Sequence, residues 1–266
     1  MRTKSLGALV ALALIVAACG AEGNAGGTGI EGDEPVIQII SEGGFVPVEI
    51  ALNTGPRYTV LGDGRVIYQG FQTLEYPGRL VPPYMVATLD SNQLNALLAM
   101  VEDIGLPDMT EESDNTNLDF VADAPTDTIV YWDGSGEHRY SVYALGLDED
   151  PSDQNAAFIE LLETLDRFVG EAPAEPYEAE RVRVVAGVGF TDPEFADVRD
   201  WPLENRDLST WEELANGWHC LTLDGPVPEY FEDATQATTW ELPEENSEPL
   251  TLLVRPLHPG EPDCPA

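Results

Sequence analysis

The sequence predicts an α+β protein made of two consecutive small mixed domains, the first an antiparallel sheet of hairpins with two helices on one face. Three observations lead to this prediction. Two pairs of apolar runs flank short turns rich in Asp and Gly, which is typical of β-hairpins. Each pair is followed by a long segment with apolar residues at helical spacing. A Pro- and Ala-rich stretch then precedes a second half that is also mixed α and β.

The chain opens with the features of an export signal. Arg2 and Lys4 precede an apolar run over residues 6–16 that contains no charged side chain. This run is shorter than the roughly 20 residues that a helix needs to span a bilayer. It therefore indicates a processed segment and not a permanent membrane helix.

A lipidation motif follows directly. Val16-Ala17-Ala18-Cys19 resembles the bacterial lipobox, in which small residues fit the signal peptidase and the cysteine thiol receives a diacylglyceryl group. Residues 20–34 have almost no apolar content and could not bury a core thiol. We therefore expect a lipoprotein signal peptide at 1–18, lipid (palmitate-type) attachment at Cys19, and a flexible tether at 19–35. Such a chain would be held on the extracytoplasmic side of the cell membrane.

Residues 36–170 are predicted to form the first domain, beginning with a strand near 36–40. The runs 57–61 and 65–68 flank Gly62-Asp63-Gly64 and predict a hairpin. A helix is expected from Ser91 until Gly105 ends it. Its apolar stripe is Leu94, Leu97, Leu98, Val101 and Ile104.

A second hairpin and a second helix complete this domain. The strands 128–132 and 138–143 are joined by a turn at 133–136. The helix is expected to start at Ser152 or Asp153 and to close at Gly170. Its stripe is Phe158, Leu161, Leu162, Leu165 and Phe168, and one sheet face could bury both stripes.

Residues 171–177 are predicted to be a linker, and residues 178–266 a smaller mixed α/β domain. Strands are expected at 181–188, 219–223 and 250–255. Helices are expected at 227–237 and, behind a capping box at Ser209-Thr210-Trp211-Glu212, up to Gly217. The helix behind Ser209 is predicted from its capping motif, and the helix at 227–237 from its composition.

Two cysteines remain once Cys19 is assigned to lipid. In an exported chain Cys220 and Cys264 most simply form a disulfide, worth about 4 kcal/mol in the chain-entropy model. Zinc is an alternative because His219 and His258 are close to them in sequence. The spacing of a zinc motif is absent, however, so the disulfide is favoured and no metal site is expected.

The charge balance excludes some partners. The formal net charge is −37, with 49 acidic residues, 12 basic residues and a single lysine, Lys4. Such a surface repels nucleic acid and anionic lipid, so no nucleic-acid partner is expected. Genome composition, adaptation to salt and loose binding of cations remain alternative reasons for this acidity.

No residue pattern predicts a catalytic site or a cofactor. His138, His219 and His258 are far apart in sequence, and Gly134-Ser135-Gly136 lacks the spacing of a nucleophile elbow. The acidic cluster Asp148-Glu149-Asp150 with Asp153 does not match a calcium loop. A pair of facing carboxylates for glycosidase-like hydrolysis stays open. The tryptophans of the second half could form a stacking surface, although core packing is more usual.

Four segments, 44–49, 62–67, 141–145 and 255–261, resemble uncharacterised lipoproteins of GC-rich, actinobacterial-type bacteria. The resemblance implies an envelope lipoprotein and carries no activity with it. We therefore expect a non-catalytic protein that binds an envelope protein, a peptide or a cell-wall component. The alternative is an exported hydrolase that uses a carboxylate pair.

Overall fold

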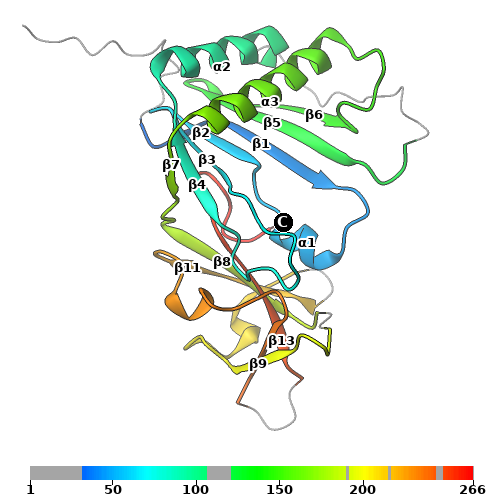
Figure 1. The fold of residues 1–266 in the computed structure, drawn as a ribbon, viewed down its shortest axis with the longest axis vertical. Coiled ribbons are helices and arrows are strands. Elements are labelled where there is room, and N and C mark those ends of the chain that lie inside the picture. Colours follow the sequence, from blue (N-terminus) through cyan, green and yellow to red (C-terminus); the bar gives the residue numbers. More distant parts are fainter. Residues whose placement is uncertain (1–31, 107–120, 190–191, 215–216, 244–247, 266) are drawn as a thin grey trace, which may run out of the picture.

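The computed structural model describes residues 32–106, 121–189, 192–214, 217–243 and 248–265. Figure 1 shows helices and two sheets, so the predicted α+β class is confirmed. Among these residues no helix is long and apolar enough to cross a membrane. The predicted signal peptide 1–18, Cys19 and most of the tether 19–35 lie outside the described residues.

The first sheet has seven strands in the order β6-β5-β1-β2-β3-β4-β7, and every neighbouring pair is antiparallel. Both predicted hairpins are present, as β2–β3 and β5–β6. The strands are β1 (Pro35–Gly43), β2 (Tyr58–Leu61), β3 (Arg65–Gln69), β4 (Tyr84–Thr88), β5 (Pro125–Asp133), β6 (Gly136–Tyr143) and β7 (Ala174–Pro176).

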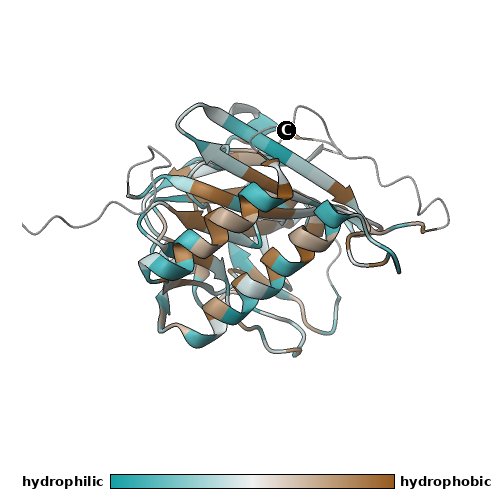
Figure 2. Cartoon of the chain, turned by 90° about the horizontal axis from the view of Figure 1, so that it is seen from above, coloured by the Kyte–Doolittle hydropathy of each residue, from teal (hydrophilic) through white to brown (hydrophobic). Residues whose placement is uncertain are grey.

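Two long helices cover one face of this sheet, as predicted (Figure 1). Helix α2 (Ser91–Ile104) begins at a capping box made by Asp90 and Gln93, and Gly105 ends it with a left-handed φ of 84°. Helix α3 (Asp153–Glu171) begins at Ser152, whose side chain accepts the Asn155 N–H. Figure 2 shows the two helices side by side, each with hydrophilic and hydrophobic residues in alternation. Their apolar residues pack with those of the sheet in one core.

The second sheet has six strands in the order β10-β11-β8-β13-β12-β9. Its only parallel pairing in the described part of the chain is between β12 and β9. The strands are β8 (Arg181–Gly187), β9 (Asp197–Asp200), β10 (Glu212–Glu213), β11 (His219–Asp224), β12 (Thr238–Glu241) and β13 (Leu250–Pro256). One face packs against Trp201, Trp211 and Phe231, and Trp240 of β12 belongs to the same core.

Three local predictions differ from the structure. The segment predicted as a linker contains β7, which pairs with β4 and so extends the first sheet. The helix predicted from Ser209 is a 3₁₀ turn, Leu208–Thr210, followed by β10. Pairing of β10 with β11 outweighs the capping box here, because the strand ladder bonds backbone groups that a helix would use.

The helix predicted at 227–237 is also wrong. Only Glu229–Phe231 is helical, as one 3₁₀ turn. The Ala234 carbonyl accepts the Leu80 N–H at 2.9 Å, and Gln236 N–H donates to the Gly78 carbonyl at 2.9 Å. These groups are bonded to the loop between β3 and β4, and therefore cannot close helical turns.

The two sheets meet at several points. The short helix α1 (Val48–Asn53) packs Val48 and Leu52 against the β8 and β11 residues Val185 and Cys220. Cys220 and Cys264 form the predicted disulfide, with Cα atoms 5.9 Å apart, in this same cluster. The chain after β13 therefore returns to the junction between the sheets and is fastened there.

Candidate functional site

The face of the first sheet opposite the helices is the candidate site. Side chains alternate along each strand, so while Tyr58 and Val60 of β2 face the helices, Thr59 and Leu61 face the other way. Ile67 of β3 and Val86 of β4 share this open face. Residues 257–264, which follow β13, cover part of it. We call them the C-terminal segment.

A buried ion pair shapes the start of the C-terminal segment. Arg255 and Glu261 are 1% and 8% exposed. Two bonds join them, Nη2 to Oε1 at 2.5 Å and Nη1 to Oε2 at 2.9 Å, and Glu261 Oε2 also accepts the His258 N–H at 2.7 Å. Burial raises the pKa of Glu261, but the hydrogen bonds and charge of Arg255 outweigh it and hold that pKa below its ordinary value. The carboxylate thus fixes the turn that carries His258.

His258 is completely buried against the open face of the sheet. Its Nδ1 lies 2.8 Å from Thr59 Oγ1, and Gln38 Nε2 donates to the same oxygen at 3.1 Å. The rings of Tyr84 and Tyr177 pack edge-to-face on the imidazole, with centroids 5.1 and 5.9 Å away. Burial lowers the pKa of His258 to about 4, so the ring is neutral at pH 7.

The hydrogen-bond network assigns the imidazole tautomer. Thr59 Oγ1 already accepts from Gln38, so its own hydroxyl is free to donate to His258 Nδ1. The ring proton then sits on Nε2, which has no hydrogen-bond partner among the described residues. A buried, unpaired N–H donor is unusual, because leaving it unbonded costs about 1–3 kcal/mol.

Further contacts fasten the end of the C-terminal segment. Arg183 of β8 donates to the Pro262 and Asp263 carbonyls at 2.7 and 3.0 Å, and Thr222 of β11 donates to the Asp263 carbonyl at 2.9 Å. Burial, followed by the nearby charge of Arg255, lowers the pKa of Arg183 to about 10. Together with the disulfide, these bonds to the second sheet hold the C-terminal segment in place as a wall on the open face of the first sheet.

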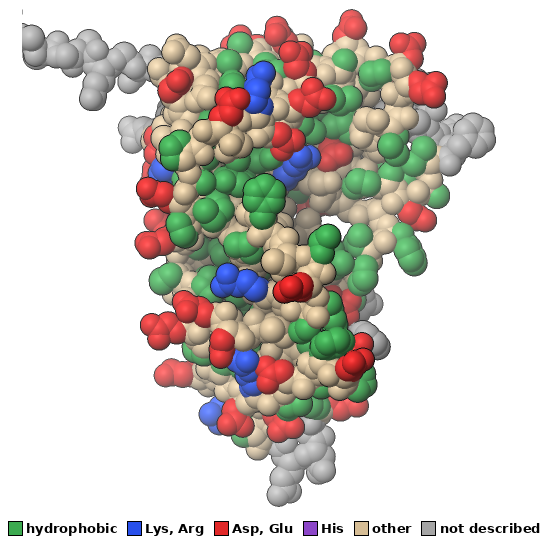
Figure 3. Space-filling view, in the orientation of Figure 1, with side chains coloured by type: hydrophobic (Ala, Val, Ile, Leu, Met, Phe, Trp, Pro, Cys, Tyr) green, Lys and Arg blue, Asp and Glu red, His purple; other side chains and the backbone are tan. Residues whose placement is uncertain are grey.

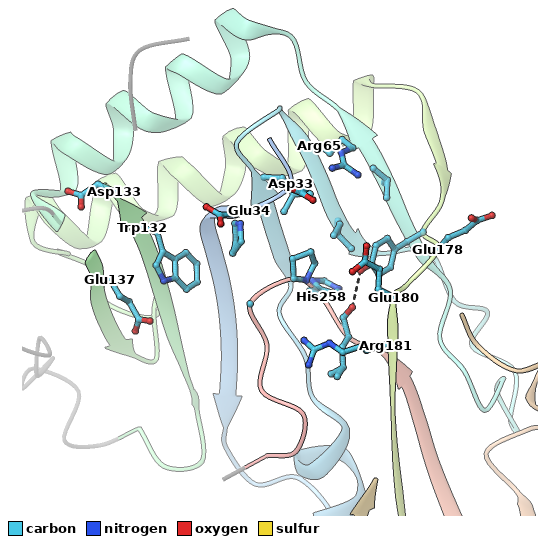
Figure 4. Close-up of a pocket in the computed structure, with 18 of the residues that line it drawn as sticks. Asp33, Glu34, Arg65, Trp132, Asp133, Glu137, Glu178, Glu180, Arg181 and His258 are labelled. Atoms are coloured by element: carbon cyan, nitrogen blue, oxygen red, sulfur yellow. Dashed lines mark hydrogen bonds between the residues drawn. The ribbon is translucent and has the colours of Figure 1, made fainter. Parts of the chain in front are cut away.

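A cleft of about 790 Å³ remains beside this wall, on the uncovered part of the sheet face (Figure 4). Its apolar floor is formed by Leu61, Ile67 and Val86 together with Tyr177 and Leu257. Figure 4 shows Trp132, Asp133 and Glu137 on one side, Glu178 and Glu180 on the other, and Asp33 and Glu34 between them. The volume lies within the usual range of small-molecule pockets.

The rim of the cleft carries unneutralised negative charge. Its two arginines are occupied, because Arg65 pairs with Asp63 at 2.7 Å and Arg181 pairs with Asp263. Two of its six carboxylates also have partners: Asp133 lies 3.2 Å from His138, and Glu137 lies 3.1 Å from Arg139. The other four carboxylates have no ion-pair partner among the described residues. They are Asp33, Glu34, Glu178 and Glu180.

Trp132 provides an aromatic wall. Tyr131, its neighbour on β5, packs into the helix-covered core, so the pleat of the strand turns Trp132 to the open face. Trp132 is partly exposed and lines the cleft. By contrast, Trp201, Trp211, Trp218 and Trp240 are only 2–6% exposed. The tryptophans of the second half therefore form core and not the stacking surface considered from the sequence.

A second cavity, of about 500 Å³, lies between α1, the loop between β3 and β4, and strand β13. Ile50 and Tyr76 line it and are 55% and 52% exposed, and Phe71 and Leu74 of the same loop are fully exposed. Figure 3 shows one face of the molecule, with apolar side chains gathered near its middle and many acidic but few basic side chains around them. The charged cleft is the better-defined site, because it combines a cavity with polar groups that have no partner in the described part of the chain.

The residues predicted from the sequence fall in different places. Cys19 lies outside the described residues, and Cys220 and Cys264 are joined, which leaves them unable to bind zinc as thiolates. His138 is on the edge strand β6, His219 on β11 and His258 in the C-terminal segment, so the three do not converge. In the described part of the chain, no group of His, Cys, Asp and Glu side chains is placed to hold a metal ion.

The cleft itself is not predicted from the sequence. Its residues come from the tether end, the two hairpins, the segment before β8 and the C-terminal segment, which are far apart along the chain. The one local signal is the run Leu257-His258-Pro259-Gly260-Glu261, where a histidine precedes a Pro-Gly turn and an acid follows it.

Comparisons of the chain with protein-family models, with curated proteins and with solved structures found no match. The cleft is therefore interpreted from its own chemistry.

Proposed function

We propose that this protein is a lipid-anchored, non-catalytic binding protein of the extracytoplasmic membrane surface, which receives an envelope peptide, protein or cell-wall component in the cleft. The observation that carries the proposal is the cleft itself. It combines an apolar floor, an aromatic wall and four carboxylates without an ion-pair partner among the described residues, in one cavity of about 790 Å³. An apolar floor with polar groups placed at its rim is typical of ligand-binding sites.

The position of the tether supports this proposal. Asp33 and Glu34, at the start of the described chain, form part of the cleft rim. With lipid at Cys19, an extended tether would reach at most about 45 Å, at roughly 3.3 Å per residue. The cleft would then sample ligands in the layer directly above the membrane.

The alternative, an exported hydrolase with a carboxylate pair, has no specific support. Such chemistry needs a carboxyl group with a raised pKa to donate the proton. Hydrogen bonds from Ser135 lower the pKa of Asp133, a cleft residue, to about 2. Burial raises the pKa of Asp127, but Asp127 does not line the cleft.

Site-specific photocrosslinking in living cells tests the binding function. A photoreactive amino acid replaces Glu180 at the cleft rim and, as the control, Glu163 on the exposed face of α3. We expect a distinct crosslinked species from position 180 and none from position 163. No crosslink at 180, or the same crosslinks from both positions, would contradict the proposal.

Fractionation of cells tests the anchor. Cys19→Ser removes the thiol that would accept lipid. The wild-type chain should incorporate labelled palmitate and sediment with membranes, and the variant should incorporate none and should be misprocessed or released. A mature, membrane-bound Cys19→Ser chain would show that the lipoprotein assignment is wrong.

A further inference from the structure

We propose that the ligand of the cleft is a cationic peptide segment, with an ammonium or guanidinium group at the carboxylate rim and a backbone carbonyl that accepts from His258. This inference rests on the proposed binding function and names the class of ligand.

The charge of the rim favours a cation. Asp33 and Glu34 on one strand end, and Glu178 and Glu180 before β8, approach the same cavity without any ion-pair partner in the described chain. The arginines that could neutralise them are held elsewhere, Arg65 by Asp63 and Arg181 by Asp263. A positive group of a ligand would relieve the repulsion between these carboxylates.

The walls of the cleft suit the stem of a long basic side chain. Lys and Arg carry aliphatic stems that pack on apolar surface while their charged ends stay at a polar rim. Val86 and Trp132 are partly exposed in the cleft and offer that surface. Trp132 stands at the edge, where a cation could also lie over an aromatic ring, an interaction worth about 0.5–2 kcal/mol.

His258 favours a peptide over a simple amine. It lines the cleft, is completely buried, and holds an Nε2–H that has no acceptor among the described residues. A peptide carbonyl would satisfy this donor once the floor side chains adjust, whereas an alkyl diamine has only donors when protonated. The His258 donor matches the backbone carbonyl of a peptide, and the acidic rim matches a basic side chain of the same peptide.

Calorimetry on the purified, lipidated protein in detergent tests the inference with three probes. These are a short blocked peptide with two lysines, the same peptide with both side-chain amines acetylated, and 1,5-diaminopentane. We expect the lysine peptide to bind most tightly, the diamine more weakly, and the acetylated peptide not at all. The binding should weaken as salt rises.

Two double variants separate the cleft from general attraction to an acidic protein. Glu178→Gln with Glu180→Gln removes two rim charges, and Glu160→Gln with Glu163→Gln removes the same number from the exposed face of α3. The cleft variant should bind the lysine peptide about fivefold or more weakly, and the helix variant within about twofold of wild type. An equal loss in both would overturn the proposal.

Nitrogen-15 labelling of histidine gives a separate readout for His258. Its Nε2 resonance should shift when the lysine peptide is added and stay unchanged with the diamine. Binding of the diamine as tight as that of the peptide would assign a free amine and overturn the peptide ligand. Binding of the acetylated peptide, or of none of the probes, would overturn a cationic ligand altogether. Should crosslinks from position 180 persist in that case, the binding function stands and only this inference fails.

Discussion

His258 Nδ1 lies 2.8 Å from Thr59 Oγ1, across 199 positions of sequence. This bond joins the C-terminal segment to β2 in the middle of the first sheet. Because Glu261 and Arg255 fix the same turn from the side of the second sheet, one buried network connects both sheets. The stability of the C-terminal segment and that of the first sheet should therefore depend on each other.

Thr59→Val should destabilise the protein by about 1–3 kcal/mol, because it keeps the side-chain shape and leaves His258 Nδ1 and the Gln38 amide buried without a partner. Urea unfolding measures the loss. Thr88→Val on β4 is the matched control, since Thr88 is exposed, and it should change the free energy of unfolding by less than about 0.5 kcal/mol. Equal effects of the two substitutions would argue against the network.

Acid should weaken the fold through His258. Its pKa falls from 6.5 to about 4 on burial, so between these values the unfolded chain binds a proton that the folded chain excludes. The free energy of unfolding should therefore fall as pH drops from about 6.5 to 5, by up to about 1.4 kcal/mol per pH unit. Urea titrations of wild type and His258→Gln at each pH check this. The variant should lack this part of the slope, and identical slopes would contradict the assignment.

Arg255 and Glu261 should show strong coupling in a double-mutant cycle. Arg255→Met or Glu261→Gln alone leaves a buried polar group without its partner and should cost about 3–5 kcal/mol. The double variant should recover part of that loss, because neither charge is then left unpaired. Denaturant unfolding of the four proteins measures the coupling, and simply additive losses would mean that the two side chains act separately.

The disulfide should matter for binding as well as for stability. Replacing Cys220 and Cys264 by Ser should lower the free energy of unfolding by up to about 4 kcal/mol and loosen the wall that carries His258, so that the affinity of the cleft falls. A reductant should do the same to wild type and nothing further to the double variant. A variant that binds the lysine peptide as tightly as wild type would show that the wall holds without its disulfide.

Much of the first sheet is predictable from local sequence, because local sequence decides it. The Gly62-Asp63-Gly64 turn, the Asp90 cap, the Gly105 end and the apolar stripes each act within a few residues. The second half is predicted less well. Residues 227–237 have helical composition and residues 209–212 form a capping box. However, Ala234 and Gln236 bond to the loop between β3 and β4, and β10 pairs with β11. The loop between β3 and β4 is distant in sequence and leaves no local trace, whereas β11 follows β10 directly and the capping motif conceals that pairing.

The sequence by itself determined the α+β class, the hairpins and long helices of the first sheet, the excess of negative charge and the pairing of Cys220 with Cys264. Each of these follows from local patterning, composition or a count of cysteines. Only the tertiary structure decided that Trp132 faces a cleft while the other tryptophans are core, that β7 extends the first sheet, and that His258 is buried beside Thr59. These features arise where segments far apart in the chain meet, and contacts of that kind depend on how the sheets pack.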